Sequence, residues 1–420
     1  NEGTDAGTYF GENYELLENH GAATWAEFPY DTNFKAWCLS ASAWRNALGV
    51  RTDPVQYLRD VSEPAGLALL KEILTNGYIM VFGTYISSWQ IKAIQDDPST
   101  SADNAAVGEA AGYWVNGTEG SHGMTVVGYN DAVWTDVNGN GAIDAGEKGA
   151  LRIANSWGTG WNAADGGFIW LAYDALRTVS AVPDGPSAGR VPAFQSNAAY
   201  VFTIRDAYAP SMVAEFTVNH LKRDQLKIVL GLSSLSSSTP TTTWTPWALQ
   251  NQGGAYAFDG STTAVDGTFV FDLTDILVED GGPLRYFLGA NDNAAGDIAT
   301  LASFKIIDTT TEPDTEVVSP NGSQTVDYGQ IYAWADHTYE GPAYNHPPKL
   351  GSGQVLPATG APSQPFSFYV YYQDQDGDVP TVKTIVLDDV AYSMSLYSGS
   401  ATSGSPAVMP PSSSTVTFVV

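Results

Sequence analysis

The chain has 420 residues and a formal net charge of −28, from 18 Lys and Arg against 46 Asp and Glu. Such acidity excludes the basic surface that nucleic acids or anionic lipids require, so we expect neither partner. No apolar run is long enough to predict a membrane span. Charged residues make up only 15% of the chain, and this acidic composition favours a secreted or cell-surface protein. The length predicts about two to four domains.

Residues 1–185 are expected to form an α+β domain. The pattern at residues 14–21 indicates the end of an amphipathic helix that stops at a glycine, and residues 67–74 have helical spacing. Residues 78–86 are predicted as a buried strand. Three further predicted strands are residues 124–129, 149–154 and 167–172.

The rest of the chain is expected to form two all-β sandwich domains. Residues 190–335 contain short apolar runs between turn signals, which predict a β-sandwich or jelly roll. These runs are residues 201–204, 214–218, 226–230, 268–272, 286–289 and 302–307. Residues 344–420 begin with a Pro-Pro boundary signal, and the alternation at 366–372 predicts a small Ig-like sandwich, incomplete at its end.

Two segments of the first domain carry the strongest chemical signal. One begins a predicted strand with Ser121-His122-Gly123, and the other reads Asn155-Ser156-Trp157-Gly158 and continues to Trp161. Here the chain resembles papain-like cysteine peptidases. The resemblance implies that His122 is the base, that Asn155 orients its ring and that Trp157 shields their hydrogen bond. It implies hydrolysis of protein or peptide substrates through an acyl-thioester.

The resemblance also implies a nucleophilic cysteine on a helix that comes before everything in this chain. We therefore expect the nucleophile to be missing from residues 1–420, because the resemblance implies that residues 1–185 correspond to only the C-terminal part of the family's domain. The sole cysteine, Cys38, follows the Pro-Tyr turn that comes after the cleft glycines, so it is interpreted as a structural thiol. An upstream Cys-bearing segment or a partner chain would then complete the cleft.

A second signal lies between the two halves of this pair, at residues 136–147. Its spacing matches every ligand position of an EF-hand loop, with Gly141 at the sharp turn. The predicted ligands are Asp136, Asn138, Asn140, the Ala142 carbonyl, Asp144 and Glu147. Oxygen ligands at this spacing favour Ca²⁺. The flanks lack helical patterns, so we expect a calcium loop inside a hairpin that stabilises the peptidase domain.

A weaker calcium hypothesis concerns the third domain, where Asp374, Asp376 and Asp378 alternate. A plain acidic turn is an equally good interpretation of this pattern.

Three functions stay open at this point. The first is a secreted papain-like cysteine endopeptidase that needs a thiol from elsewhere. The second is a non-catalytic structural or adhesive protein, built on a degenerate peptidase fold, that self-assembles through sandwich edges. The third is a carbohydrate-binding module, although the sequence places no binding platform.

Overall fold

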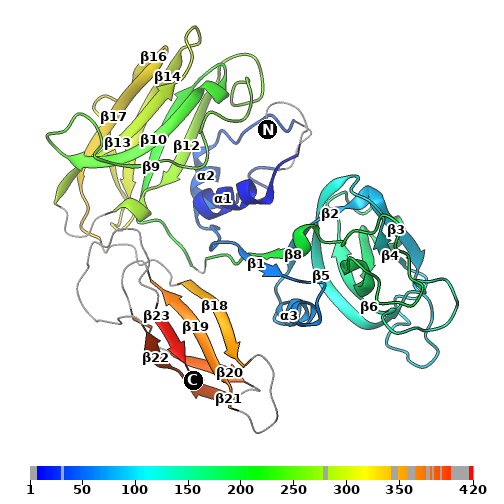
Figure 1. Cartoon of the computed structure of the whole chain (residues 1–420). Coiled ribbons are helices and arrows are strands. Elements are labelled where there is room, and N and C mark those ends of the chain that lie inside the picture. Colours follow the sequence, from blue (N-terminus) through cyan, green and yellow to red (C-terminus); the bar gives the residue numbers. More distant parts are fainter. Residues whose placement is uncertain are drawn as a thin grey trace.

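The computed structural model describes residues 7–29, 33–205, 207–277, 282–341, 349–357, 365–374, 379–380, 383–387, 390–398 and 416–419. These residues form three α-helices and several β-sheets, so the fold is largely β (Figure 1). None of the helices in the described ranges has the length and apolar character that a membrane crossing requires.

The first body is an eight-stranded sheet. Its strand order is β1 (Gln56–Arg59), β8 (Ala198–Val201), β2 (Met80–Tyr85), β5 (Ser121–Trp134), β6 (Lys148–Ala154), β7 (Phe168–Ala172), β4 (Ala110–Val115) and β3 (Trp89–Ala93). All neighbours are antiparallel except β4 and β7. The strands predicted at residues 78–86, 124–129, 149–154 and 167–172 are therefore confirmed, with shifted ends.

Helix α3 (Pro64–Thr75) packs against this sheet and confirms the helix predicted at residues 67–74. Proline starts the helix without losing a hydrogen bond, and Asn76-Gly77 ends it. Lys71 on α3 bonds both carboxylate oxygens of Asp131 on β5 at 2.8 Å. The helix is thus held against the strand that carries His122.

The second body consists of two sheets packed over one apolar core. One sheet has the order β11 (Thr242–Trp244), β10 (Leu226–Ser234), β13 (Pro283–Asp292) and β17 (Gly329–Thr338). The other has the order β12 (Asp266–Asp272), β9 (Met212–Asn219), β14 (Ala299–Asp308) and β15 (Thr315–Val318), with β16 (Gln324–Val326) also paired to β14. Inward side chains alternate along each strand, as in Phe269 and Phe271 of β12.

The prediction of residues 201–204 as the first strand of the sandwich is wrong. Within this run only Val201 belongs to a strand, as the last residue of β8, which pairs with β1 and β2 inside the eight-stranded sheet. A short apolar run predicts a strand, but its partners depend on the path of the chain around it.

Helices α1 (Phe10–His20) and α2 (Ala41–Leu48) pack against the sandwich (Figure 1). Ser40 caps α2 by accepting from Ala43 N, and Trp44 of α2 contacts Phe269 and Phe271. The ring of His20 at the end of α1 accepts from Ala248 N at 3.1 Å. This N-terminal segment, expected to serve the first domain, therefore contributes to the sandwich core.

The chain after α2 joins the two bodies. Residues 52–53 run antiparallel to residues 203–204, so that an extension of the β1–β8 pair continues toward the sandwich. Beside it, Arg51 donates to Asp272 at 2.6 Å and to the Glu18 carbonyl at 2.6 Å. Arg51 and Asp272 are both buried, so this ion pair fixes the segment on the sandwich.

The C-terminal part contains one four-stranded and one two-stranded sheet. The first has the order β18 (Lys349–Leu356), β19 (Ser367–Gln373), β23 (Val416–Val419) and β22 (Ser395–Ser398). The second pairs β20 (Thr384–Leu387) with β21 (Val390–Ser393). The strand predicted at residues 366–372 corresponds to β19.

Candidate functional site

Antiparallel pairing of β5 with β6 brings the two halves of the predicted pair together. His122 lies at the start of β5, and Asn155 directly follows β6. His122 Nε2 lies 2.8 Å from Asn155 Oδ1, although 33 residues separate them in the sequence. The contact is part-buried, and its length lies within the normal range of a hydrogen bond.

This contact determines the tautomer of the imidazole ring. An amide oxygen only accepts hydrogen bonds, so the His122 proton sits on Nε2 in the neutral ring. Nδ1 then carries a lone pair and can take a proton from an acid placed beside it. When Nδ1 becomes protonated, the Asn155 oxygen still accepts from Nε2 and stabilises the imidazolium.

Trp157 covers the histidine. The centroids of the His122 and Trp157 rings are 4.4 Å apart with an interplanar angle of 34°, and Trp161 packs edge-on against Trp157 at 6.1 Å. One face of Trp157 remains open to solvent, since 53% of the residue is exposed. The indole therefore lies between water and the His122 ring.

The side-chain amide nitrogen of Asn155, Nδ2, is buried and has no hydrogen-bond partner among the described residues. Its backbone N–H is bonded to the Gly167 carbonyl at 3.2 Å, which closes the loop between β6 and β7. The side chain is thus oriented through its oxygen, by His122 alone.

Phe10 and two glycines form a contact beside the histidine that sequence reasoning missed. A Cβ at Gly123 would lie 3.1 Å from two ring carbons of Phe10, and one at Gly83 would lie 3.3 Å from a third. Gln195 also approaches Gly83 and donates to Ser121 Oγ at 3.0 Å. In the sequence, Gly123 beside His122 was the signal that another side chain, here Phe10, packs closely against the strand.

Cys38 lies elsewhere. Its neighbour Trp37 donates to the Phe258 carbonyl at 2.8 Å, and Leu39 accepts from Thr268 N at 3.4 Å. Both partners belong to the sandwich, whereas His122 lies near the start of β5, an interior strand of the eight-stranded sheet. The interpretation of Cys38 as a thiol outside the His122 arrangement agrees with this placement.

Residues 136–147 connect β5 to β6, so the predicted calcium loop lies in a hairpin. Asp136 Oδ1 accepts from Gly139 N at 2.7 Å and from Asn140 N at 3.1 Å, while Asp136 Oδ2 accepts from Gly141 N at 3.1 Å. Gly139 and Gly141 have φ of 78° and 75°, which favours glycine at both positions. The backbone therefore wraps around the first predicted ligand.

The other predicted ligands converge in the same loop. Asn138 Nδ2 and Asn140 Nδ2 donate to Asp144 Oδ2 at 2.7 and 2.6 Å. Glu147 is 1% exposed and accepts from Trp134 Nε1 at 2.9 Å. In this arrangement the amide nitrogens of Asn138 and Asn140 face Asp144, and Ala142 N donates to Asn140 Oδ1 at 2.7 Å. No group of three or more His, Cys, Asp or Glu side chains that could hold a metal ion is found among the described residues. Calcium binding by this loop therefore stays a prediction from the ligand spacing.

The weaker metal hypothesis is only partly covered by the described residues. Asp374 Oδ2 accepts from Tyr372 OH at 3.4 Å. Asp376 and Asp378 lie outside the described residues.

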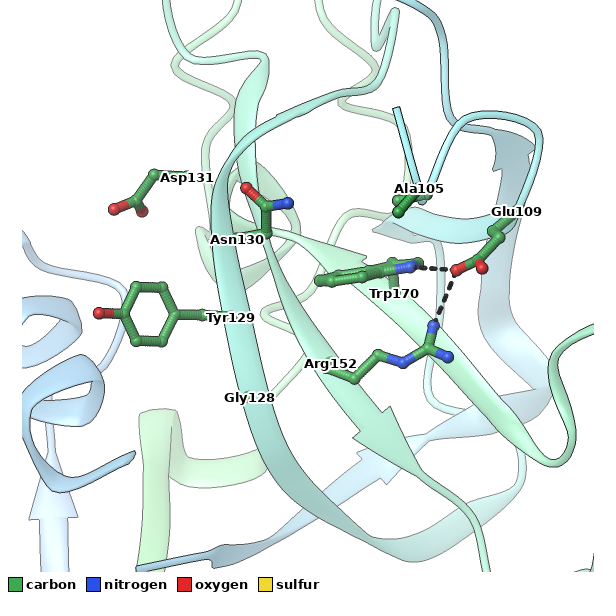
Figure 2. Close-up of a pocket in the computed structure, with 9 residues that line it drawn as sticks. Ala105, Glu109, Gly128, Tyr129, Asn130, Asp131, Arg152 and Trp170 are labelled. Carbon is green, nitrogen blue, oxygen red and sulfur yellow. Dashed lines mark hydrogen bonds and ion pairs between the residues drawn. The ribbon is translucent and has the colours of Figure 1, made fainter. Parts of the chain in front are cut away.

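A hollow of about 690 Å³ lies on a different part of the eight-stranded sheet (Figure 2). Glu109, Arg152 and Trp170 face it, and His122 is not among its lining residues. Figure 2 shows Arg152 and Trp170 both reaching the Glu109 carboxylate, while Tyr129 points to the other side of β5. This hollow and the His–Asn pair are therefore separate features.

Comparison of the chain with protein families, curated proteins and solved structures finds no significant match.

Proposed function

We propose that this chain carries the base and the orienting amide of a papain-like cysteine endopeptidase that acts on proteins or peptides outside the cell. The main support is the 2.8 Å contact between His122 Nε2 and Asn155 Oδ1, with Trp157 packed on the imidazole. A base with a fixed tautomer and a shielded orienting bond is the arrangement that activates a thiol.

The chemistry follows from the free Nδ1 of His122. A thiol beside it loses its proton to Nδ1, which gives a thiolate and an imidazolium. The thiolate attacks the peptide carbonyl, and the imidazolium returns its proton to the leaving amine, which leaves an acyl-thioester. Water then hydrolyses the thioester, with His122 again acting as base.

The thiol must come from outside the 420 residues, because Cys38 is the sole cysteine and is held on the sandwich. An upstream segment or a partner chain would supply it. The position of Cys38 on the sandwich also agrees with the alternative function, which needs no nucleophile. That alternative is a non-catalytic structural or adhesive protein that self-assembles through sandwich edges.

Alkylation of the native preparation distinguishes the two functions. At about pH 6 an ordinary thiol is mostly protonated, whereas a thiol paired with imidazole reacts with iodoacetamide. We expect rapid labelling of a cysteine other than Cys38, and His122→Ala should slow it at least about tenfold, a typical loss for a removed base. The control Asp336→Asn, in the sandwich, should react like the wild type. Labelling of Cys38 alone would support the structural alternative.

We also propose that residues 136–147 bind Ca²⁺ and stabilise the first body. Three carboxylates, two amide oxygens and the Ala142 carbonyl provide the hard oxygen ligands that this ion prefers. Millimolar calcium outside cells would keep even a weak site of this kind occupied. The loop joins the strands of His122 and Asn155, so ordering it would also stiffen their pairing.

Chelation tests this proposal. Removing calcium at low ionic strength should lower the melting temperature, because a ligand that binds only the folded state stabilises it. Glu147→Gln should abolish this sensitivity, while the surface variant Glu316→Gln should retain it. An unchanged melting temperature of the wild type in chelator would exclude a structural calcium ion.

A further inference from the structure

The loop between Asn155 and β7 carries both tryptophans of the site. Residues 156–160, including Trp157, are exposed, so packing alone does not hold the loop. Its backbone is closed at one end by the bond from Asn155 N to the Gly167 carbonyl. A short turn of 3₁₀-helix, η2 (Ala163–Asp165), lies near the other end.

Three contacts tie this loop to the sheet: Trp161 packs on the core, Asn162 Nδ2 donates to the Phe168 carbonyl, and Asp165 forms an ion pair with Arg152. Arg152 on β6 donates from Nη1 to Asp165 Oδ2 at 2.5 Å and from Nη2 to Asp165 Oδ1. The Asp165 side chain is only 7% exposed. A bidentate pair between guanidinium and carboxylate fixes both direction and distance, so the end of the loop has a defined position on the sheet.

Arg152 is itself held from three sides. Its guanidinium lies 5.2 Å from the Phe168 ring centroid and 4.9 Å from that of Trp170. Glu109 Oε2 accepts from Arg152 Nη1 at 3.0 Å and from Trp170 Nε1 at 2.6 Å, as Figure 2 shows. The polar groups at this edge of the hollow are therefore paired with one another. This pairing favours a rigid support over a ligand site.

We propose that Arg152 and Asp165 are positioning residues that hold Trp157 over the bond between His122 and Asn155. Asn155 Nδ2 has no partner within the described part of the chain, so the orientation of this amide depends on the His122 bond. Water that reached the bond would compete for both groups. Trp157 keeps water away only while its loop is fixed, and the Arg152–Asp165 pair fixes it. The catalytic meaning of this arrangement rests on the proposed function.

The isosteric variant Asp165→Asn tests the assignment in the 420-residue chain as it exists. Nitrogen-15 NMR of the His122 ring reports the tautomer, and amide exchange reports the loop. We expect Asp165→Asn to lower the fraction of the Nε2–H tautomer and to speed amide exchange across residues 155–167 about tenfold, since a charged hydrogen bond is lost. Asp165→Glu should restore part of both signals.

A matched control exists in the sandwich. Arg285 pairs in the same bidentate manner with Asp336 and stacks on Trp334 at 3.7 Å. Asp336→Asn should leave the His122 tautomer and the exchange of residues 155–167 unchanged. Wild-type signals in Asp165→Asn, or equal changes in both variants, would overturn the assignment. Neither readout needs a nucleophile, so a failed alkylation experiment would refute the proposed function without affecting this result.

Discussion

At the scale of single residues, the His122–Asn155 contact was predicted from the resemblance of two short motifs, and the antiparallel pairing of β5 with β6 brings the two residues together. The calcium loop was predicted from the spacing of its oxygen-bearing residues within one segment. Asp165, Arg152 and Glu109 were not predicted as a group, because single charges on three separate segments carry no pattern. Only the folded sheet brings them together.

Gly123 provides a prediction at this scale. A side chain there would meet the Phe10 ring at 3.1 Å, so Gly123→Val should destabilise the fold by about 1–3 kcal/mol through overpacking. Phe10→Ala should make the same substitution much less harmful. Urea unfolding of both single variants and the double variant measures the coupling. Strictly additive effects would mean that the two residues do not touch.

At the scale of elements, strands and helices were predicted to within a few residues wherever apolar periodicity was clear. The exceptions are instructive. Helix α2 was missed because it has only eight residues, and β8 was assigned to the wrong sheet because a short strand does not specify its partners. The apolar face of α1 showed that it would be buried, but not against which body.

The packing of α1 predicts a pH dependence. Burial, with a smaller effect from nearby Arg51, lowers the pKa of His20 from 6.5 to about 3. Between these values the unfolded state binds the additional proton. The free energy of unfolding is therefore not reduced by His20 above about pH 6.5. As the pH falls from there toward 3, protonation of His20 in the unfolded state lowers the free energy of unfolding by up to about 1.4 kcal/mol per pH unit.

His20→Gln checks this prediction. Glutamine can still accept from Ala248 N but does not titrate, so the variant should lose less stability than the wild type between about pH 6.5 and pH 5. Urea unfolding at several pH values provides the comparison. Parallel stability curves for the two proteins would show that His20 does not contribute to the acid sensitivity.

At the scale of the whole molecule, residues 7–29 and 33–51 include contacts to both the eight-stranded sheet and the sandwich. A domain boundary drawn from sequence alone could not reveal this, because an N-terminal segment can pack against any body within its reach. Phe10 lies against the glycines beside His122, while His20 at the other end of α1 lies in the sandwich core. One helix thus contacts both bodies.

Arg51 provides the corresponding prediction. Arg51→Met would leave the Asp272 carboxylate buried without its cation and should destabilise the protein by about 3–5 kcal/mol. Replacing both residues, as Arg51→Met with Asp272→Leu, should recover most of that loss, because no buried charge then remains. Chemical denaturation of the wild type and of both variants measures the difference. A double variant as unstable as Arg51→Met would refute the pairing as the cause.

The proposed role of His122 is to act as the base for a thiol that lies outside residues 1–420. Its most direct test is a short bifunctional alkylating reagent, applied to the native preparation and followed by peptide mass spectrometry. If His122 has this role, we expect a cross-link between His122 and a cysteine in a peptide outside residues 1–420. A preparation in which His122 is not linked to any cysteine, and in which Cys38 is the sole alkylated thiol, would contradict it.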